Sequence, residues 1–202
     1  MNRQQSAARL ITDLVVRRPG LWRLFRGRTR RLFDGIAPTW ETRIGPHHLG
    51  ALLRALEDVE APRRALDLGT GTGVAAKAVA ERFPEAEVVG LDLSPAMIEE
   101  AKRRLPPELG GRVRFAVADA SALRFDDGDA ELVTLMNMIP FFDELARLTA
   151  SHGTVVVSFS RGAETPIYVP FERLCDELGT RGFAEFAEFS ADPATALRAT
   201  KR

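Results

Sequence analysis

Cysteine is almost missing from this chain, because Cys175 is the only one among its 202 residues. A single cysteine cannot form an internal disulfide or a cysteine-based zinc site, and it favours a reducing compartment. Long apolar runs are missing too: none approaches the roughly 18 residues of a bilayer-spanning helix. Charges interrupt the first residues, which therefore lack the apolar core of a secretion signal. We expect a soluble, cytoplasmic protein without a metal site.

Net charge is also absent, since 28 lysines and arginines balance 28 aspartates and glutamates. The distribution is uneven, however: residues 1–31 hold nine arginines and one acid, Asp13, so they carry +8 and the rest of the chain carries −8. A basic arm is typical of contact with nucleic acid, an anionic membrane or an acidic partner. Arginine is abundant throughout this chain, which weakens that signal. Nucleic acid is therefore disfavoured as a partner, and peripheral membrane contact through the arm stays an open alternative.

The first 60 residues show helical patterns and no strand. Apolar residues recur every three or four positions between Ala7 and Val15, and Pro19-Gly20 ends the pattern. Two further helices are expected at 21–33 and 47–59. We predict a helical arm or cap over residues 1–60 and one domain over residues 61–202.

From Ala65 onward, short apolar runs alternate with helical stretches, which is the pattern of βαβ units and a parallel sheet. Asp192-Pro193 divides the last segment into two halves that fit a terminal strand pair. The expected strands before that pair are 65–68, 88–91, 113–117, 132–136 and 154–159, and the expected helices are 74–83, 95–105, 141–149 and 171–180. The predicted fold class is α/β: a Rossmann-like, doubly wound, mostly parallel seven-stranded sheet with an antiparallel terminal strand, plus the N-terminal helical cap.

A glycine-rich loop joins the first expected strand to the next helix. From residue 66 to residue 74 it reads Leu-Asp-Leu-Gly-Thr-Gly-Thr-Gly-Val. Such glycines let a ligand approach the backbone, and the helix start offers free N–H groups. The dinucleotide fingerprint G-x-G-x-x-G counted from Gly69 fails at Val74, and a phosphate loop would need Gly-Lys-Ser/Thr. The loop resembles motif I of the class I S-adenosylmethionine-dependent methyltransferases, in which an acid precedes G-x-G-x-G.

Two more acids, Asp92 and Asp119, end the next two expected strands. Asp92 can accept hydrogen bonds from both ribose hydroxyls of a nucleoside. The resemblance, which covers residues 65–202, implies that Asp119 accepts from the adenine amino group while the amide of Ala120 meets the ring. It also implies that Leu93 and Met97 flank the purine.

Simpler explanations exist for each acid: Asp67 could orient the loop, Asp92 could pair with an arginine, and Asp119 could start a turn with Ser121. Three acids at the ends of successive strands nevertheless favour a binding edge. The residues that we assign to S-adenosylmethionine are Asp67, Gly69, Thr70, Gly71, Gly73, Asp92, Leu93, Met97, Asp119, Ala120 and Asn137.

Asn137 stands where amino-methylating DNA and protein enzymes read Asn/Asp-Pro-Pro-Tyr/Phe. This chain reads Asn-Met-Ile-Pro-Phe from residue 137 to residue 141, which breaks the motif. A base-flipping adenine methyltransferase is therefore disfavoured.

Methyl transfer depends mainly on positioning, because the sulfonium methyl is already activated, and we assign no catalytic residue. His47 or His48 is a candidate base, and Trp40 and Arg43 are candidates to face the cofactor from the cap. By elimination, acceptor specificity falls to residues 21–49 and to residues 161–170, which include Tyr168.

The predicted function is transfer of a methyl group from S-adenosylmethionine to a small-molecule acceptor. Two alternatives stay open: a non-catalytic S-adenosylmethionine-binding partner or regulatory protein, and a methyltransferase acting on a membrane-associated, quinone-like substrate or on RNA. The acceptor, the methylated atom and the oligomeric state stay open as well.

Overall fold

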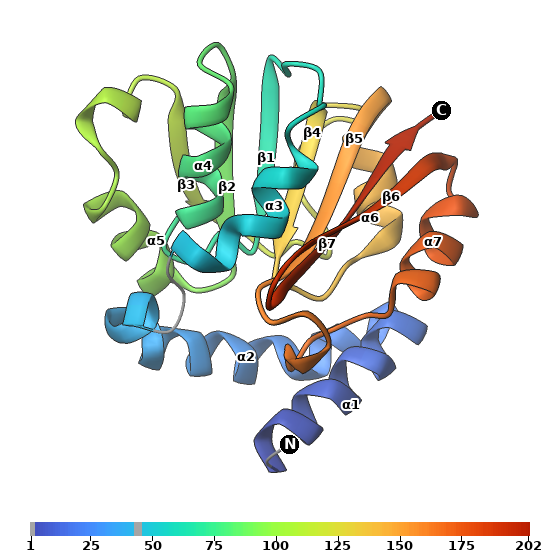
Figure 1. Ribbon diagram of the computed structural model, residues 1–202. Coiled ribbons are helices and arrows are strands. Elements are labelled where there is room, and N and C mark those ends of the chain that lie inside the picture. Colours follow the sequence, from blue (N-terminus) through green and yellow to red (C-terminus); the bar gives the residue numbers. More distant parts are fainter. Residues whose placement is uncertain (1–2, 43–45) are drawn as a thin grey trace.

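A computed structural model describes residues 3–42 and 46–202 of the chain. Seven strands in this described part form one sheet (Figure 1), in the order β3-β2-β1-β4-β5-β7-β6. All neighbouring pairs are parallel except those of β7, which runs antiparallel to both β5 and β6. The strands are β1 (Arg64–Leu68), β2 (Glu87–Asp92), β3 (Val113–Val117), β4 (Ala130–Met136), β5 (Thr149–Phe159), β6 (Phe183–Ala191) and β7 (Ala194–Lys201).

The predicted doubly wound sheet is confirmed, with one refinement. The antiparallel strand comes last in the sequence, but it lies inside the sheet, between β5 and β6. The five parallel strands lie where the apolar runs place them, although β5 starts earlier than expected, at Thr149. Its first residues pair with Ala130 of β4 across an irregularity in the register. The order reverses between β1 and β4, so the carboxyl ends of these strands meet at a switch point.

Helices cover both faces of the sheet, and each face has its own apolar core. One core contains α3 (Gly50–Ala55), α4 (Val74–Arg82) and α5 (Pro95–Arg103). The other contains α6 (Phe142–Leu148) and α7 (Phe171–Gly179). Neighbouring residues of one strand serve the two cores in turn, as Leu132 and Val133 of β4 do. Burial on both faces explains why the strands read as continuous apolar runs.

The N-terminal 60 residues divide into two parts. Helix α3, which follows a 3₁₀ turn at Pro46–Leu49, packs on β6 and β7 and belongs to the cover of the sheet. The preceding elements are α1 (Arg3–Arg17), a 3₁₀ turn at Pro19–Leu21, α2 (Trp22–Ile36) and a 3₁₀ segment at Ala37–Thr42. We call residues 3–42 the arm. Figure 1 shows α1 and α2 crossing beneath one edge of the sheet.

Helix α1 holds the arm to the loop after β5. Its Arg9 guanidinium donates to the carbonyl oxygens of Ala163 and Thr165 at 2.7 and 3.0 Å and lies 5.4 Å from the ring centroid of Tyr168. Val15 and Val16 join the core beside α6. None of the helices in the described ranges has the length and apolar character that a membrane crossing requires.

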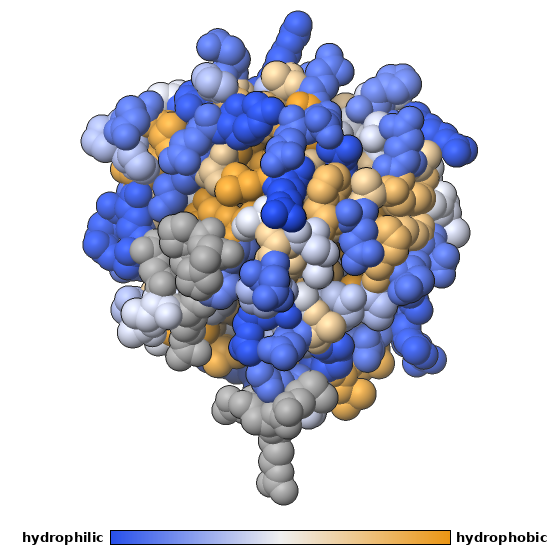
Figure 2. All heavy atoms as spheres, in the orientation of Figure 1, coloured by the Kyte–Doolittle hydropathy of each residue, from blue (hydrophilic) through white to orange (hydrophobic). Residues whose placement is uncertain are grey.

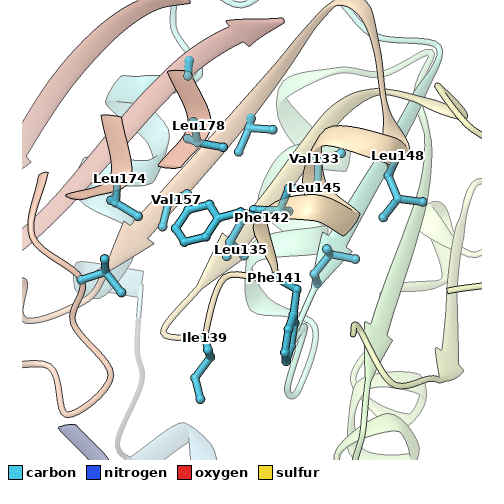
Figure 3. Close-up of a cluster of buried hydrophobic side chains, with 14 of the residues drawn as sticks. Val133, Leu135, Ile139, Phe141, Phe142, Leu145, Leu148, Val157, Leu174 and Leu178 are labelled. Carbon is cyan, nitrogen blue, oxygen red and sulfur yellow. The ribbon is translucent and has the colours of Figure 1, made fainter. Parts of the chain in front are cut away.

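Replacement of Leu145 by alanine should test the core beneath α6. Leu145 is fully buried, and Figure 3 shows it close to Val133 and Leu135 of β4. Loss of its side chain should lower the free energy of unfolding by about 2–5 kcal/mol in urea titrations followed by circular dichroism. The matched control is Leu24→Ala on the exposed side of α2, which should change stability by less than about 0.5 kcal/mol. Equal losses in the two variants would contradict this description of the core.

Candidate functional site

The glycine loop turns from β1 into α4 at the carboxyl edge of the sheet. Gly69, Gly71 and Gly73 have φ angles of +67°, +54° and +80°, in the left-handed region that favours glycine. A Cβ atom at Gly69 would lie 2.8 Å from the sulfur of Met138, and one at Gly73 would lie 2.6 Å from the ring of Phe115. The loop backbone is therefore closely enclosed by the elements that follow β4 and by β3.

Asp67 lies in β1 directly before this loop and is almost completely buried, with 1% of its surface exposed. Its Oδ1 accepts a hydrogen bond of 2.9 Å from the hydroxyl of Thr134 in β4, while its Oδ2 has no hydrogen-bond partner. Burial raises the pKa of Asp67 to about 6, and the side chains of Thr70 and Thr134 act in the opposite direction. A buried acceptor without a donor is unusual in a folded protein. This oxygen can accept a hydrogen bond from a bound molecule.

Asp92 ends β2 and is tied to the glycine loop. Its Oδ2 accepts from the N–H of Gly71 at 2.9 Å, and its Oδ1 accepts from the N–H of Ser94 at 2.8 Å. Burial raises the pKa of Asp92, and these two N–H groups oppose the rise. Each oxygen keeps capacity for a further hydrogen bond. The carboxylate can therefore accept from two neighbouring hydroxyls at once.

The apolar residues assigned to the site lie beside these carboxylates. Leu93 is half-buried directly after Asp92, and Met97 is 1% exposed in the first turn of α5, where its N–H donates to the hydroxyl of Ser94. Ala120 is half-buried after Asp119, and Thr70 is buried in the glycine loop.

Asp119 lies two residues beyond β3 and is held by the arm. Its Oδ1 accepts from the indole N–H of Trp22 at 2.9 Å and from the N–H and hydroxyl of Ser121 at 3.0 and 2.8 Å. Its Oδ2 lies 3.5 Å from Arg26. Burial raises the pKa of Asp119, but these donors outweigh it and hold the pKa below its usual range. The turn with Ser121 is thus present, and Oδ2 retains capacity for a ligand.

Asn137 has both ends of its side-chain amide engaged. Its Nδ2 donates to the hydroxyl of Ser160 at 2.8 Å, and its Oδ1 accepts from the N–H of the same residue at 2.9 Å. The side chain therefore joins the ends of β4 and β5, and Asn137 has a positive φ of 54°.

The arm covers the same edge of the sheet. A Cβ atom on Gly71 would lie 3.2 Å from the indole nitrogen of Trp40, and Phe33 packs edge-on against that indole at 5.6 Å. Asp34 accepts a hydrogen bond of 2.6 Å from the hydroxyl of Ser94. Trp40 thus lies beside the glycine loop.

Sequence reasoning missed three arm residues at the site: Trp22, Arg26 and Asp34. The one feature of the sequence that pointed to these residues is their location in a segment rich in aromatic and charged side chains. Two of the expected cap residues cannot be compared, since Arg43 lies outside the described residues and so does the side chain of His47. Tyr168 packs edge-on against Phe159 with ring centroids 5.0 Å apart.

Comparison with known proteins assigns the family. Residues 65–156 match the family model described as a methyltransferase domain. The chain is 40% identical over 168 residues to a demethylmenaquinone methyltransferase of Thermus thermophilus, covering 73% of this chain and 75% of that protein. The chain belongs to the class I S-adenosylmethionine-dependent methyltransferases.

Other relatives of this methyltransferase chain match over a smaller part of their length. It is 54% identical over 71 residues to a trans-aconitate 2-methyltransferase of Methylobacterium radiotolerans, covering 35% of this chain and 25% of that protein. It is 39% identical over 146 residues to a malonyl-[acyl-carrier protein] O-methyltransferase of Halorhodospira halophila, covering 67% of this chain and 48% of that protein. The match thus spans a quarter to a half of these two relatives.

Solved structures of methyltransferases share the fold. A S-adenosylmethionine-dependent methyltransferase from Aquifex aeolicus superposes with a TM-score of 0.66 at 14% identity, covering 82% of this chain and 98% of that one. The methyltransferase solved with the Haloferax volcanii Trm112 activator gives 0.69 at 19% identity, covering 83% and 96%. At these identities the likeness concerns the fold alone.

S-adenosylmethionine is the cofactor of this family, and the residues of this methyltransferase fit it. Gly69, Gly71 and Gly73 give the loop positive φ angles and leave no room for a Cβ atom, so the backbone turns closely at the start of α4. The unpartnered Oδ2 of Asp67 matches a cationic ammonium group, and the spare acceptors of Asp92 match ribose hydroxyls.

Asp67 should make the stability of the ligand-free methyltransferase depend on pH. The pKa of its folded state, about 6, lies above the ordinary value of 3.8, so the folded state binds this proton more strongly than the unfolded state. Its contribution to stability is therefore complete at low pH and is lost as the pH rises through the folded pKa. Asp67→Asn keeps an oxygen for Thr134 and cannot ionise.

As the pH rises from about 4 to about 7, the wild type should therefore lose up to about 3 kcal/mol of unfolding free energy relative to the Asp67→Asn variant. Urea titrations at a series of pH values measure this difference, with the exposed Asp126→Asn variant as background. A difference that does not change with pH would contradict the assignment.

Proposed function

We propose that this methyltransferase is catalytically active and transfers the methyl group of S-adenosylmethionine to a small-molecule acceptor. The observation that carries this proposal is the position of Asp67, Asp92 and Asp119 at the carboxyl ends of β1, β2 and β3, beside a glycine loop with three positive φ angles. The single cysteine favours the cytoplasm as the place of this reaction.

The site residues have distinct roles in this proposal. Asp92 binds the ribose hydroxyls, and Asp119 accepts from the adenine amino group through Oδ2. Asp67 and the glycine loop hold the methionine end. The cofactor supplies a methyl group that is already activated, so the protein mainly positions the acceptor and excludes water.

The acceptor binds between the carboxyl edge and the arm. Residues 21–49 and 161–170 supply its specificity, and the contacts of Arg9 with Ala163 and Thr165 bring the second segment together with the arm. The relatives named above are a quinone-type methyltransferase and two enzymes named for carboxylic acids or their carrier-bound forms. Quinols and carboxylic acids are therefore the acceptor classes to test first.

Asp92→Asn tests the cofactor assignment. An amide nitrogen in place of one oxygen would face the N–H of Gly71 or Ser94, so S-adenosylhomocysteine should bind at least about tenfold more weakly, as measured by calorimetry. Asp126→Asn is the matched control and should bind as the wild type does. NAD should bind neither protein, and equal affinity of both variants for S-adenosylhomocysteine would overturn the site.

Catalysis is tested separately with a panel of quinols, carboxylic acids and RNA, by measuring the S-adenosylhomocysteine produced. Turnover with a small molecule supports the proposal. Tight cofactor binding without turnover on any acceptor would favour the non-catalytic, regulatory alternative.

The exposed side of the arm favours a second candidate: peripheral membrane contact that serves a lipid-soluble acceptor. Leu10, Leu24 and Leu32 are 70%, 67% and 59% exposed, and the arginines at 28 and 31 are exposed beside the last two. On the face shown in Figure 2, hydrophilic side chains predominate and apolar ones are exposed between them. An exposed helix face with leucines and arginines suits the surface of an anionic bilayer.

Vesicle co-sedimentation tests this candidate. Binding to phosphatidylglycerol vesicles should exceed binding to phosphatidylcholine vesicles. It should fall about tenfold or more in Arg28→Gln/Arg31→Gln, since each surface arginine contributes about 1 kcal/mol. Leu24→Ser/Leu32→Ser should also weaken it. Binding to RNA that the leucine variant leaves unchanged would favour nucleic acid instead.

A further inference from the structure

The two oxygens of Asp119 differ in their surroundings. Oδ1 accepts three hydrogen bonds, one from the indole of Trp22 and two from Ser121, all between 2.8 and 3.0 Å. Oδ2 has one neighbour, Arg26, at 3.5 Å. The side chain of Arg26 is 57% exposed, so water weakens this ion pair strongly. Oδ1 is thus filled by the protein, and Oδ2 is the acceptor that a ligand can use.

This asymmetry fixes the rotation of the carboxylate. Ser121 lies two residues from Asp119 and forms a local turn that moves with it. Trp22 comes from a different part of the chain and anchors Oδ1 to the arm. The indole is buried and packs edge-on against Phe141 at 5.6 Å, so its N–H is held in a set direction.

We propose that Trp22 is a positioning residue that makes the site selective for adenine: by holding Oδ1, it turns Oδ2 of Asp119 toward the exocyclic amino group of the cofactor. An ionised carboxylate only accepts hydrogen bonds, so it attracts an amino group and repels a carbonyl oxygen. A base with a carbonyl at that position, as in inosine, is therefore rejected.

The same contact couples the arm to the cofactor. Trp22 is the first residue of α2, and the arm carries the segment that faces the acceptor. A cavity of about 280 Å³ lies beside the contact, bordered by Trp22, Arg26, Ser121 and Phe141. In this proposal, the position of α2 against the sheet and the recognition of adenine depend on each other. The proposal rests on the proposed binding of S-adenosylmethionine.

The test compares two ligands by calorimetry: S-adenosylhomocysteine and its deaminated analogue, S-inosylhomocysteine. The wild type should prefer the adenine ligand by more than about tenfold. Trp22→Phe keeps a ring against Phe141 and loses only the N–H donor. It should bind S-adenosylhomocysteine about five- to tenfold more weakly and the analogue equally well, so that the preference falls by the same factor.

Two arm variants are matched controls. Arg23→Gln removes a charge from the same helix at a side chain without a hydrogen bond or ion pair in the described structure, and it should leave the preference unchanged. Arg26→Gln should change it by less than about twofold, because that ion pair is exposed. Circular dichroism verifies that each variant is folded.

Asp119→Asn separates this inference from the proposed function. Its amide can donate to the carbonyl of inosine, so the preference for adenine should collapse if Asp119 reads the base. If Asp119→Asn leaves the preference intact, the proposed cofactor site is wrong. If Asp119→Asn abolishes it while Trp22→Phe weakens both ligands equally, Trp22 only packs and the inference on positioning is overturned. An unfolded Trp22→Phe would be replaced by Trp22→His, whose ring N–H should retain part of the preference.

Discussion

Three acidic side chains lie at one edge of the sheet, and the groups that donate hydrogen bonds to them organise the structure around this edge. Parallel strands end on the same side, so Asp67, Asp92 and Asp119 lie at a common edge. Each carboxylate is held by a group from elsewhere: Thr134 of the next strand, the backbone of the glycine loop, and Trp22 and Arg26 of the arm. Hydrogen bonds of Trp22 and Asp34 therefore join the arm, which carries a charge of +6 over residues 3–42, to the rest of the chain, which carries −6.

Local patterns made the sheet predictable. Strands buried on both faces must be apolar throughout, and Ser94-Pro95 provides a hydroxyl cap and a residue without N–H where α5 begins. The same holds for the loop, because positive φ angles at residues 69, 71 and 73 favour glycine. Such constraints act within a few residues of the chain. They are therefore visible in the sequence without knowledge of the fold.

Contacts between distant segments were not predictable in this way. Trp22 lies 97 residues from Asp119, and Asp34 lies 60 residues from Ser94. Nothing near Trp22 distinguishes an indole that donates to a carboxylate from one that fills a core. The hydrogen bonds of the Asn137 amide with Ser160, which directly follows β5, are a further contact of this kind, and the assignment of Asn137 to the cofactor stays a prediction. The packing of helix α3 on the sheet was not predictable either, because its apolar spacing suits a cap and a helix that covers a sheet equally well.

Local and distant constraints act on different parts of the chain, and this difference affects which residues can determine the choice of acceptor. The glycine loop must satisfy backbone geometry, because its positive φ angles favour glycine, and in the proposed function this loop and the strand ends hold the cofactor. The arm has only to place donors and aromatic rings over the edge, and its outer side is free of the core. Relatives named for acceptors as different as a quinone and a tricarboxylic acid match the shared domain. In the proposed function, changes in the arm and in residues 161–170 would therefore alter the acceptor while the glycine loop keeps its geometry. Trp22 and Asp34 limit such changes, because at these residues the arm forms hydrogen bonds with Asp119 and Ser94, beside the proposed cofactor site.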